Sequence, residues 1–118
     1  MGHKILVVDD EEDMLSVLCA QLRNHNFAVI PAASGSEALA KATAEKPNVI
    51  IMDIMMPELD GNQVAERLKA EPSVADVPII FLSALQEKNE ASEDGTSIVF
   101  AKPYNIEELV GKIKELID

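Results

Sequence analysis

The chain has 118 residues, a common length for one domain, and 47% of them are hydrophobic, which is enough for a core. Its formal net charge of −11 at pH 7 disfavours direct binding to nucleic acid or to an anionic membrane, and suits metal ions or basic protein partners. The one cysteine, Cys19, cannot form an internal disulfide, and we expect it to be a core residue. There is no charged-then-apolar leader and no long apolar run, so a cytoplasmic protein, or a piece of a larger one, is expected.

Short apolar runs alternate with amphipathic stretches along the chain, which predicts alternating strands and helices. Five runs have the length and composition of buried strands, and in chain order they are 4–8, 27–32, 49–52, 78–83 and 97–101. Helical patterns follow these strands at 12–25, 34–43, 61–71 and 106–117, and the polar stretch 86–94 is weakly helical.

Local signals refine two of these elements. Pro31 suggests that the second strand lies at an edge of the sheet, because proline cannot donate a ladder hydrogen bond. Ser34 and Glu37 have the spacing of a capping box at the start of the second helix. Strict alternation of apolar strands and helices predicts a parallel sheet with helices on both faces, in one domain that spans residues 1–118.

Polar residues stand where the predicted strands end. Asp9 and Asp10 follow the first strand, Asp53 follows the third, and Ser83 and Lys102 end the fourth and fifth. On its position alone, Asp53 reads equally well as a solvated loop residue. In an open α/β sheet, however, ligands bind beyond the carboxyl ends of the strands, so all five residues are expected at one edge. This convergence favours a functional site.

The residue types at this edge suggest phosphoryl chemistry. Three acids together require a divalent cation, and a ligand set made of oxygen atoms points to Mg²⁺, with Mn²⁺ as the alternative ion. Lys102 and Ser83 suit the remaining oxygens of a transferring phosphoryl group. Asp53 is then the expected nucleophile and would form an aspartyl phosphate.

The segments KILVVDDEEDMLSVL, VIIMDIMMPELDG, FLSA and AKPY resemble, in the right order, the receiver domain of bacterial two-component response regulators. The resemblance covers nearly the whole chain. It implies a flavodoxin-like, doubly wound fold with five parallel strands in the order 2-1-3-4-5, in which this chain's fourth helix is expected to be shorter than is usual for the family. It also implies a phosphoacceptor domain that signals and is not an enzyme, whose partners are a histidine kinase or phosphotransfer protein and a downstream effector, with no direct contact to nucleic acid or membrane.

The resemblance also assigns roles to individual residues. Asp9 and Asp10 correspond to the acid pair that binds the metal, Asp53 corresponds to the phosphoacceptor, and Met55 would offer its backbone carbonyl to the metal.

Three more residues complete the site that the resemblance implies. Ser83 would contact the phosphoryl group, Lys102 would pair with it, and the Lys102–Pro103 bond is expected to be cis.

The chain departs from this family in two places. Val99, three residues before Lys102, stands where many relatives carry a switching aromatic residue, and Phe100 is expected to face the opposite side of the strand. The stretch from Ser83 to Lys102 is also about one helical turn short. We therefore expect the signal to leave the site through a change in the segment 86–94, without an aromatic switch.

Two other functions compete with the phosphoacceptor hypothesis. A haloacid-dehalogenase-like phosphatase also uses a strand-end Asp and Mg²⁺, but it needs an acid two residues later, where this chain has Met55. A phosphorylation-independent, receiver-like protein-binding module remains as the alternative, because both departures fall on the surface through which receivers signal.

Overall fold

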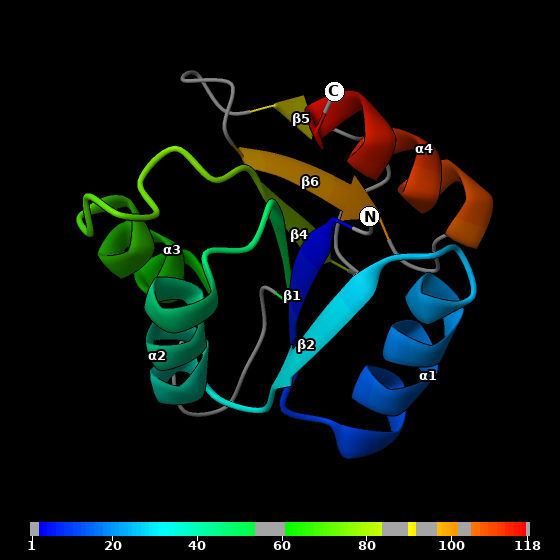
Figure 1. Cartoon of the computed structure of the whole chain (residues 1–118), viewed down its shortest axis with the longest axis horizontal. Helices are drawn as coiled ribbons and strands as arrows, with labels where there is room; N and C mark the ends of the chain where they lie inside the picture. The colour runs from blue at the N-terminus through cyan, green and yellow to red at the C-terminus, as the bar shows by residue number, and fades with distance from the viewer. Residues whose placement is uncertain (1–2, 54–60, 84–89, 92–96, 102–104, 118) are drawn as a thin grey trace.

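A computed structural model describes residues 3–53, 61–83, 90–91, 97–101 and 105–117. In these residues six strands form one sheet, in the order β2-β1-β3-β4-β6-β5 (Figure 1). All neighbouring strands pair in parallel except β5 and β6, which are antiparallel. The strands are β1 (Lys4–Val8), β2 (Ala28–Ala32), β3 (Val49–Asp53), β4 (Ile79–Ser83), β5 (Glu90–Ala91) and β6 (Ser97–Ala101).

Helices cover both faces of the sheet. Figure 1 shows α1 and α4 on one side and α2 and α3 on the other. The described helices are α1 (Glu12–Arg23), α2 (Gly35–Glu45), α3 (Gly61–Lys69) and α4 (Ile106–Ile117). None of them is long and apolar enough to cross a membrane. The predicted flavodoxin-like α/β fold, with a parallel sheet between two helical layers, is confirmed.

The structure differs from two predictions at the segment 86–94. The sheet has six described strands and not five, and two residues of this weakly helical stretch form a strand. Glu90 and Ala91 form the short sixth strand, paired antiparallel with Val99 and Ile98 of β6, and the rest of that segment lies outside the described residues. Such a pairing uses backbone groups, which every residue carries, so it leaves no periodic signal in the sequence. The position of Pro31 on an edge strand is confirmed, because β2 is the first strand of the sheet.

The core consists of two layers because each central strand is apolar on both faces. In β1, Ile5 and Val7 belong to the layer under α1 and α4, whereas Leu6 and Val8 belong to the layer under α2 and α3. Four residues of α1 that were predicted to share a face are buried in the first layer: Leu15, Leu18, Cys19 and Leu22. Burial also raises the pKa of the Cys19 thiol, which fits a core residue and not a nucleophile.

The start of α2 contains the predicted cap in a modified form. The Ser34 hydroxyl accepts a hydrogen bond from the Glu37 N–H at 3.1 Å, as a capping box requires. The Glu37 carboxylate accepts from the N–H of Ala33 at 2.6 Å, one residue earlier than the usual partner. It also forms an ion pair with Lys41 at 3.1 Å, so this side chain fixes the connection between β2 and α2.

Core packing predicts a sharp contrast between two substitutions on α1. Leu22 is fully buried, so Leu22→Ala should lower the free energy of unfolding by about 2–5 kcal/mol. Val17 on the same helix is 52% exposed, so Val17→Ala should change it by less than about 0.5 kcal/mol. Urea denaturation of both variants measures the difference, and equal losses would contradict the assignment of the buried face.

The contacts of Glu37 predict a pH-dependent contribution to stability. Its hydrogen bond from the Ala33 N–H, and then that from Lys41, lower the pKa of the Glu37 carboxyl. A carboxyl whose pKa is lower in the folded state stabilises the fold above its unfolded pKa of about 4.3, and this contribution is lost as the pH falls through the folded value.

Glu37→Gln should therefore lower the free energy of unfolding at pH 7, by less than about 1 kcal/mol because the side chain is 42% exposed. The difference from the parent chain should shrink below about pH 4.3. Denaturant titrations at several pH values measure it. Glu115→Gln is the matched control, since it breaks an exposed ion pair with Lys112 at 3.1 Å and no backbone contact. A difference that grows at low pH would contradict the prediction.

Candidate functional site

The carboxyl ends of β1 and β3 place two acids side by side in the sheet. Val8 and Met52 are paired across these strands, and Asp9 and Asp53 are the residues that directly follow them. On its other side Asp53 is paired with Leu82 of β4, so it ends a strand with a neighbour on both sides. The predicted convergence of strand ends therefore holds for these two acids.

Asp9 is buried, with 6% of its surface exposed. Its N–H donates to the carbonyl of Ala32 at 3.1 Å, which continues the ladder between β1 and β2 by one bond. One of its carboxylate oxygens accepts the N–H of Glu11 at 2.9 Å. This bond offsets part of the cost of burying a carboxylate, and it fixes the turn that leads into α1.

Asp53 and Asp10 differ from Asp9 in exposure. Asp53 is half-buried at the end of β3, and Asp10 is exposed. In the part of the chain that the structure describes, no three Asp, Glu, His or Cys residues form a group arranged to hold a metal ion. The described residues thus contain two acids on neighbouring strand ends and an exposed third, not a preformed cluster of three carboxylates.

The remaining predicted site residues are only partly covered. Ser83 is the last residue of β4 and pairs with Ala101 of β6, so the backbone brings the end of β6 to this edge. Lys102 follows Ala101 in the sequence, but Lys102, Met55 and Pro103 lie outside the described residues. Their roles stay predictions.

The acids present have the chemistry that Mg²⁺ requires. The ion prefers oxygen ligands, keeps several waters and is usually held by one or two carboxylates. Asp9 and Asp53 supply such a pair from two strands of the sheet, and Asp10 adds an accessible third carboxylate beside Asp9. The donor set therefore fits Mg²⁺ without histidine or cysteine.

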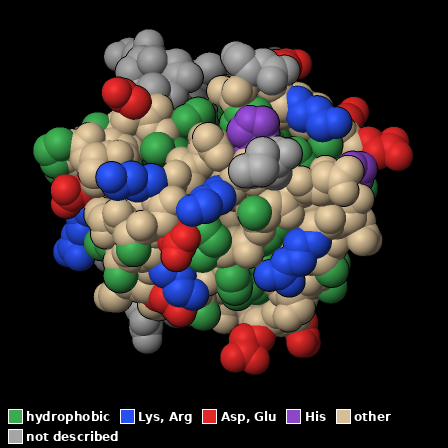
Figure 2. Space-filling model, in the orientation of Figure 1, with side chains coloured by type: hydrophobic (Ala, Val, Ile, Leu, Met, Phe, Trp, Pro, Cys, Tyr) green, Lys and Arg blue, Asp and Glu red, His purple; other side chains and the backbone are tan. Residues whose placement is uncertain are grey.

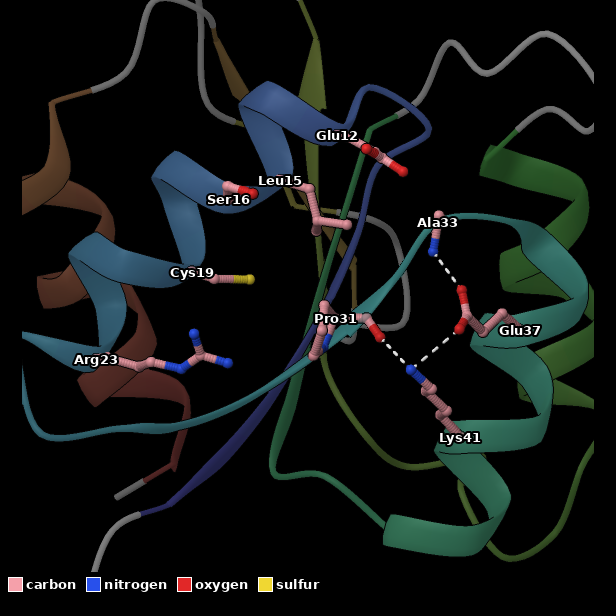
Figure 3. Close-up of a pocket in the computed structure, with 9 residues that line it drawn as sticks. All are labelled: Glu12, Leu15, Ser16, Cys19, Arg23, Pro31, Ala33, Glu37 and Lys41. Atoms are coloured by element: carbon pink, nitrogen blue, oxygen red, sulfur yellow. Dashed lines mark hydrogen bonds and ion pairs between the residues drawn. The ribbon is translucent and has the colours of Figure 1, made fainter.

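An open cavity of about 340 Å³ lies away from these acids, along β2. Figure 3 shows its lining side chains, which come from α1, β2 and α2. Arg23 and Lys41 are among them, and their contacts with the β2 backbone were not predicted. A long basic side chain on a helix next to an edge strand is only a weak indication of a contact with that strand, because most such side chains are solvated.

Comparison with known proteins identifies a family for most of the chain. The model of the "Response regulator receiver domain" family matches residues 5–114. The chain is 37% identical over 120 residues to the alkaline phosphatase synthesis transcriptional regulatory protein PhoP of Bacillus subtilis, covering 99% of this chain and 49% of that protein. It is 39% identical over 117 residues to the transcriptional regulatory protein PrrA of Mycobacterium tuberculosis, covering 97% of this chain and 49% of that protein. The chain thus spans about half the length of these curated relatives.

A solved structure is similar over nearly the whole chain. It is the receiver domain of a sensor histidine kinase from Pseudomonas aeruginosa, with a magnesium ion coordinated in its active site cleft. The two chains are 29% identical, the TM-score is 0.84, and the match covers 99% of this chain and 98% of that one.

Proposed function

Because this chain belongs to the family of response regulator receiver domains, which act in two-component signalling, we propose that residues 1–118 form one receiver domain whose phosphoacceptor is Asp53. The phosphoryl group would come from the histidine of a kinase or of a phosphotransfer protein. A carboxylate oxygen of Asp53 attacks phosphorus, the P–N bond to the donor histidine breaks, and the imidazole keeps the electron pair.

The observation that carries this proposal is the place of Asp53 in the sheet. It follows the fully buried Met52 on a central strand and is itself half-buried, so it is both fixed and accessible. Phosphoryl transfer depends mainly on positioning and on charge stabilisation, so a rigid strand end is a suitable place for the accepting oxygen.

Asp9, Asp10 and Asp53, with the backbone carbonyl of Met55, would hold Mg²⁺ or Mn²⁺. The similar receiver domain from Pseudomonas aeruginosa binds magnesium in its active site cleft, which supports this assignment. When bound, the ion neutralises negative charge and orients phosphate oxygens.

We assign Ser83 and Lys102 as the residues that contact the phosphoryl oxygens that the metal does not hold. We also assign a cis peptide bond between Lys102 and Pro103.

The partners follow from the family and from the charge of the chain. Receiver domains of response regulators interact with histidine kinases and effectors, and we place this one in the cytoplasm. The curated relatives are named as transcriptional regulators and are about twice as long as this chain. With a net charge of −11, this chain itself is unsuited to DNA, so we assign any DNA contact of the whole protein to parts beyond it.

Chemical phosphorylation tests the proposal directly. The chain should take up one phosphoryl group from acetyl phosphate in the presence of Mg²⁺, as measured by intact-protein mass spectrometry. Asp53→Asn should abolish uptake because the nucleophile is gone, and Asp10→Asn or a chelator should reduce it strongly because the metal is lost. Asp76→Asn, an exposed acid between α3 and β4, is the matched control and should label normally.

Each variant answers a different question in this experiment. Labelling of Asp53→Asn at the parent level would contradict the phosphoacceptor assignment, and normal labelling under chelator would contradict the metal requirement. A chain that binds its partner equally well with and without the label would instead favour the phosphorylation-independent module.

The sequence also predicts a long-lived phosphorylated state. Met55 and Leu85 stand two residues after Asp53 and Ser83, and neither apolar side chain can orient a water molecule for hydrolysis. Met55→Glu or Leu85→Asn should speed the loss of label by roughly tenfold, since one added hydrogen bond of about 1.4 kcal/mol in the transition state has that effect. The decay of the labelled mass over time measures the rate. Fast decay in the parent chain that neither substitution alters would refute the prediction.

A further inference from the structure

In the sheet that the described residues form, the outer edge of β2 carries backbone groups that no strand pairs with. The N–H of Ala28 donates to His3 and the carbonyl of Ala32 accepts from Asp9, so the even-numbered residues of β2 face β1. In a parallel pair the alternate residues direct their backbone groups to the other side, which makes Val29, Pro31 and Ala33 the outward set. In the described sheet β2 is the first strand, and an open edge of this kind is a template for pairing with another chain.

Side chains from both flanking helices bind these outward groups. Arg23 of α1 donates from Nη2 to the carbonyl of Val29 at 3.4 Å. Lys41 of α2 donates from Nζ to the carbonyl of Pro31 at 2.6 Å, as Figure 3 shows. Pro31 itself has no N–H to offer.

The third contact completes the row. The N–H of Ala33 donates to the Glu37 carboxylate at 2.6 Å, and Glu37 also holds Lys41 by the ion pair at 3.1 Å (Figure 3). Three outward groups are therefore already hydrogen-bonded within the chain. An incoming strand would have to displace these side chains before it could pair.

The described parts of the chain do not block access of a second strand to the β2 edge by steric hindrance. Pro31 and Ala33 line the open cavity of about 340 Å³, so this part of the β2 edge faces open space in the described structure. Figure 2 views the molecule from the side on which β2 lies in Figure 1, and it shows basic side chains among hydrophobic ones with acidic ones beside several of them. The net charge of −11 adds a general repulsion between two copies, but salt screens it, so it cannot replace local contacts at this edge.

The opposite edge of the sheet is limited in another way. There β5 has two residues, Glu90–Ala91, paired with β6. A strand this short offers few backbone groups to a partner. The edge strand β2 is longer, with five residues.

We propose that Arg23, Lys41 and Glu37, together with Pro31, close the β2 edge against pairing with the β2 strand of a second copy of this chain. The contacts act by occupying hydrogen-bonding groups. Their removal would let two copies join their sheets, which is a different outcome from the simple loss of helix anchoring.

The test variant combines Arg23→Met, Pro31→Val and Lys41→Met, which removes both donors, restores an N–H and keeps unbranched side chains on the two helices. Sedimentation equilibrium should show a mass of two chains at concentrations where the parent is monomeric, with a dissociation constant at least tenfold lower. The control Arg67→Met with Lys114→Met, on exposed positions of α3 and α4, loses the same two positive charges and gains two methionines. It should sediment as the parent does.

Hydrogen exchange locates the contact. The amide of Val29 belongs to the outward set, so its protection should rise with concentration in the triple variant and stay constant in the parent and the control. A folded variant that remains monomeric, or one that dimerises without protecting Val29, would overturn the proposal. Should the triple variant unfold, Lys41→Met alone removes the hydrogen bond to Pro31 and the ion pair with Glu37, and its dissociation constant must then also fall measurably below that of the parent chain.

Discussion

The burial of both faces of one parallel sheet is the constraint on which the rest of the structure depends. In β3, Val49 to Met52 are all fully buried, and successive residues contribute to opposite layers of the core. Each layer needs its own pair of helices, which is why α1 and α4 cover one face of the sheet and α2 and α3 cover the other. An ionisable side chain in the middle of such a strand would carry a large desolvation cost, so polar chemistry is confined to the borders of the sheet.

The two acids at the strand ends lie where the buried core changes sharply to accessible surface. Met52 is fully buried, and the next residue, Asp53, is half-buried, so the change from core to accessible surface occurs within one residue of a rigid strand. Asp9 stands at the corresponding point of β1 but is buried, and the N–H of Glu11 offsets part of that cost. The hydrophobic layers thus set the positions of both carboxylates, and local hydrogen bonds set the direction of one of them.

The sequence predicts the elements that depend on periodic burial and misses those that depend on backbone groups. The continuous apolar run from Ile5 to Val8 predicts a strand that is buried on both faces, and the single apolar face of α1 predicts the helix that covers one of them. The pairing of Glu90–Ala91 and the bond from Lys41 to Pro31 carry no such signal, since any residue can supply a carbonyl or an N–H.

The candidate site was predictable to the same extent as the fold: its place in the sheet could be predicted, and its local contacts could not. The placement of Asp9 and Asp53 follows from where two apolar strands end. The burial of Asp9 and the exposure of Asp10 do not, because they depend on the turn closed by the Glu11 N–H.

The borders of the sheet differ in the polar groups that they present to solvent. At the amino ends, Asn48 accepts from and donates to the backbone of Lys4, with both bonds at 2.8 Å. Along β2, side chains of two helices hold the outward carbonyls and an N–H. At the carboxyl ends, Asp10 and Asp53 are accessible to solvent. The first two borders thus present backbone groups that are hydrogen-bonded within the chain, whereas the third presents carboxylates that solvent can reach. Carboxylates are ligands that Mg²⁺ prefers, so this difference supports the proposal that a metal ion and a phosphoryl group bind at the third border.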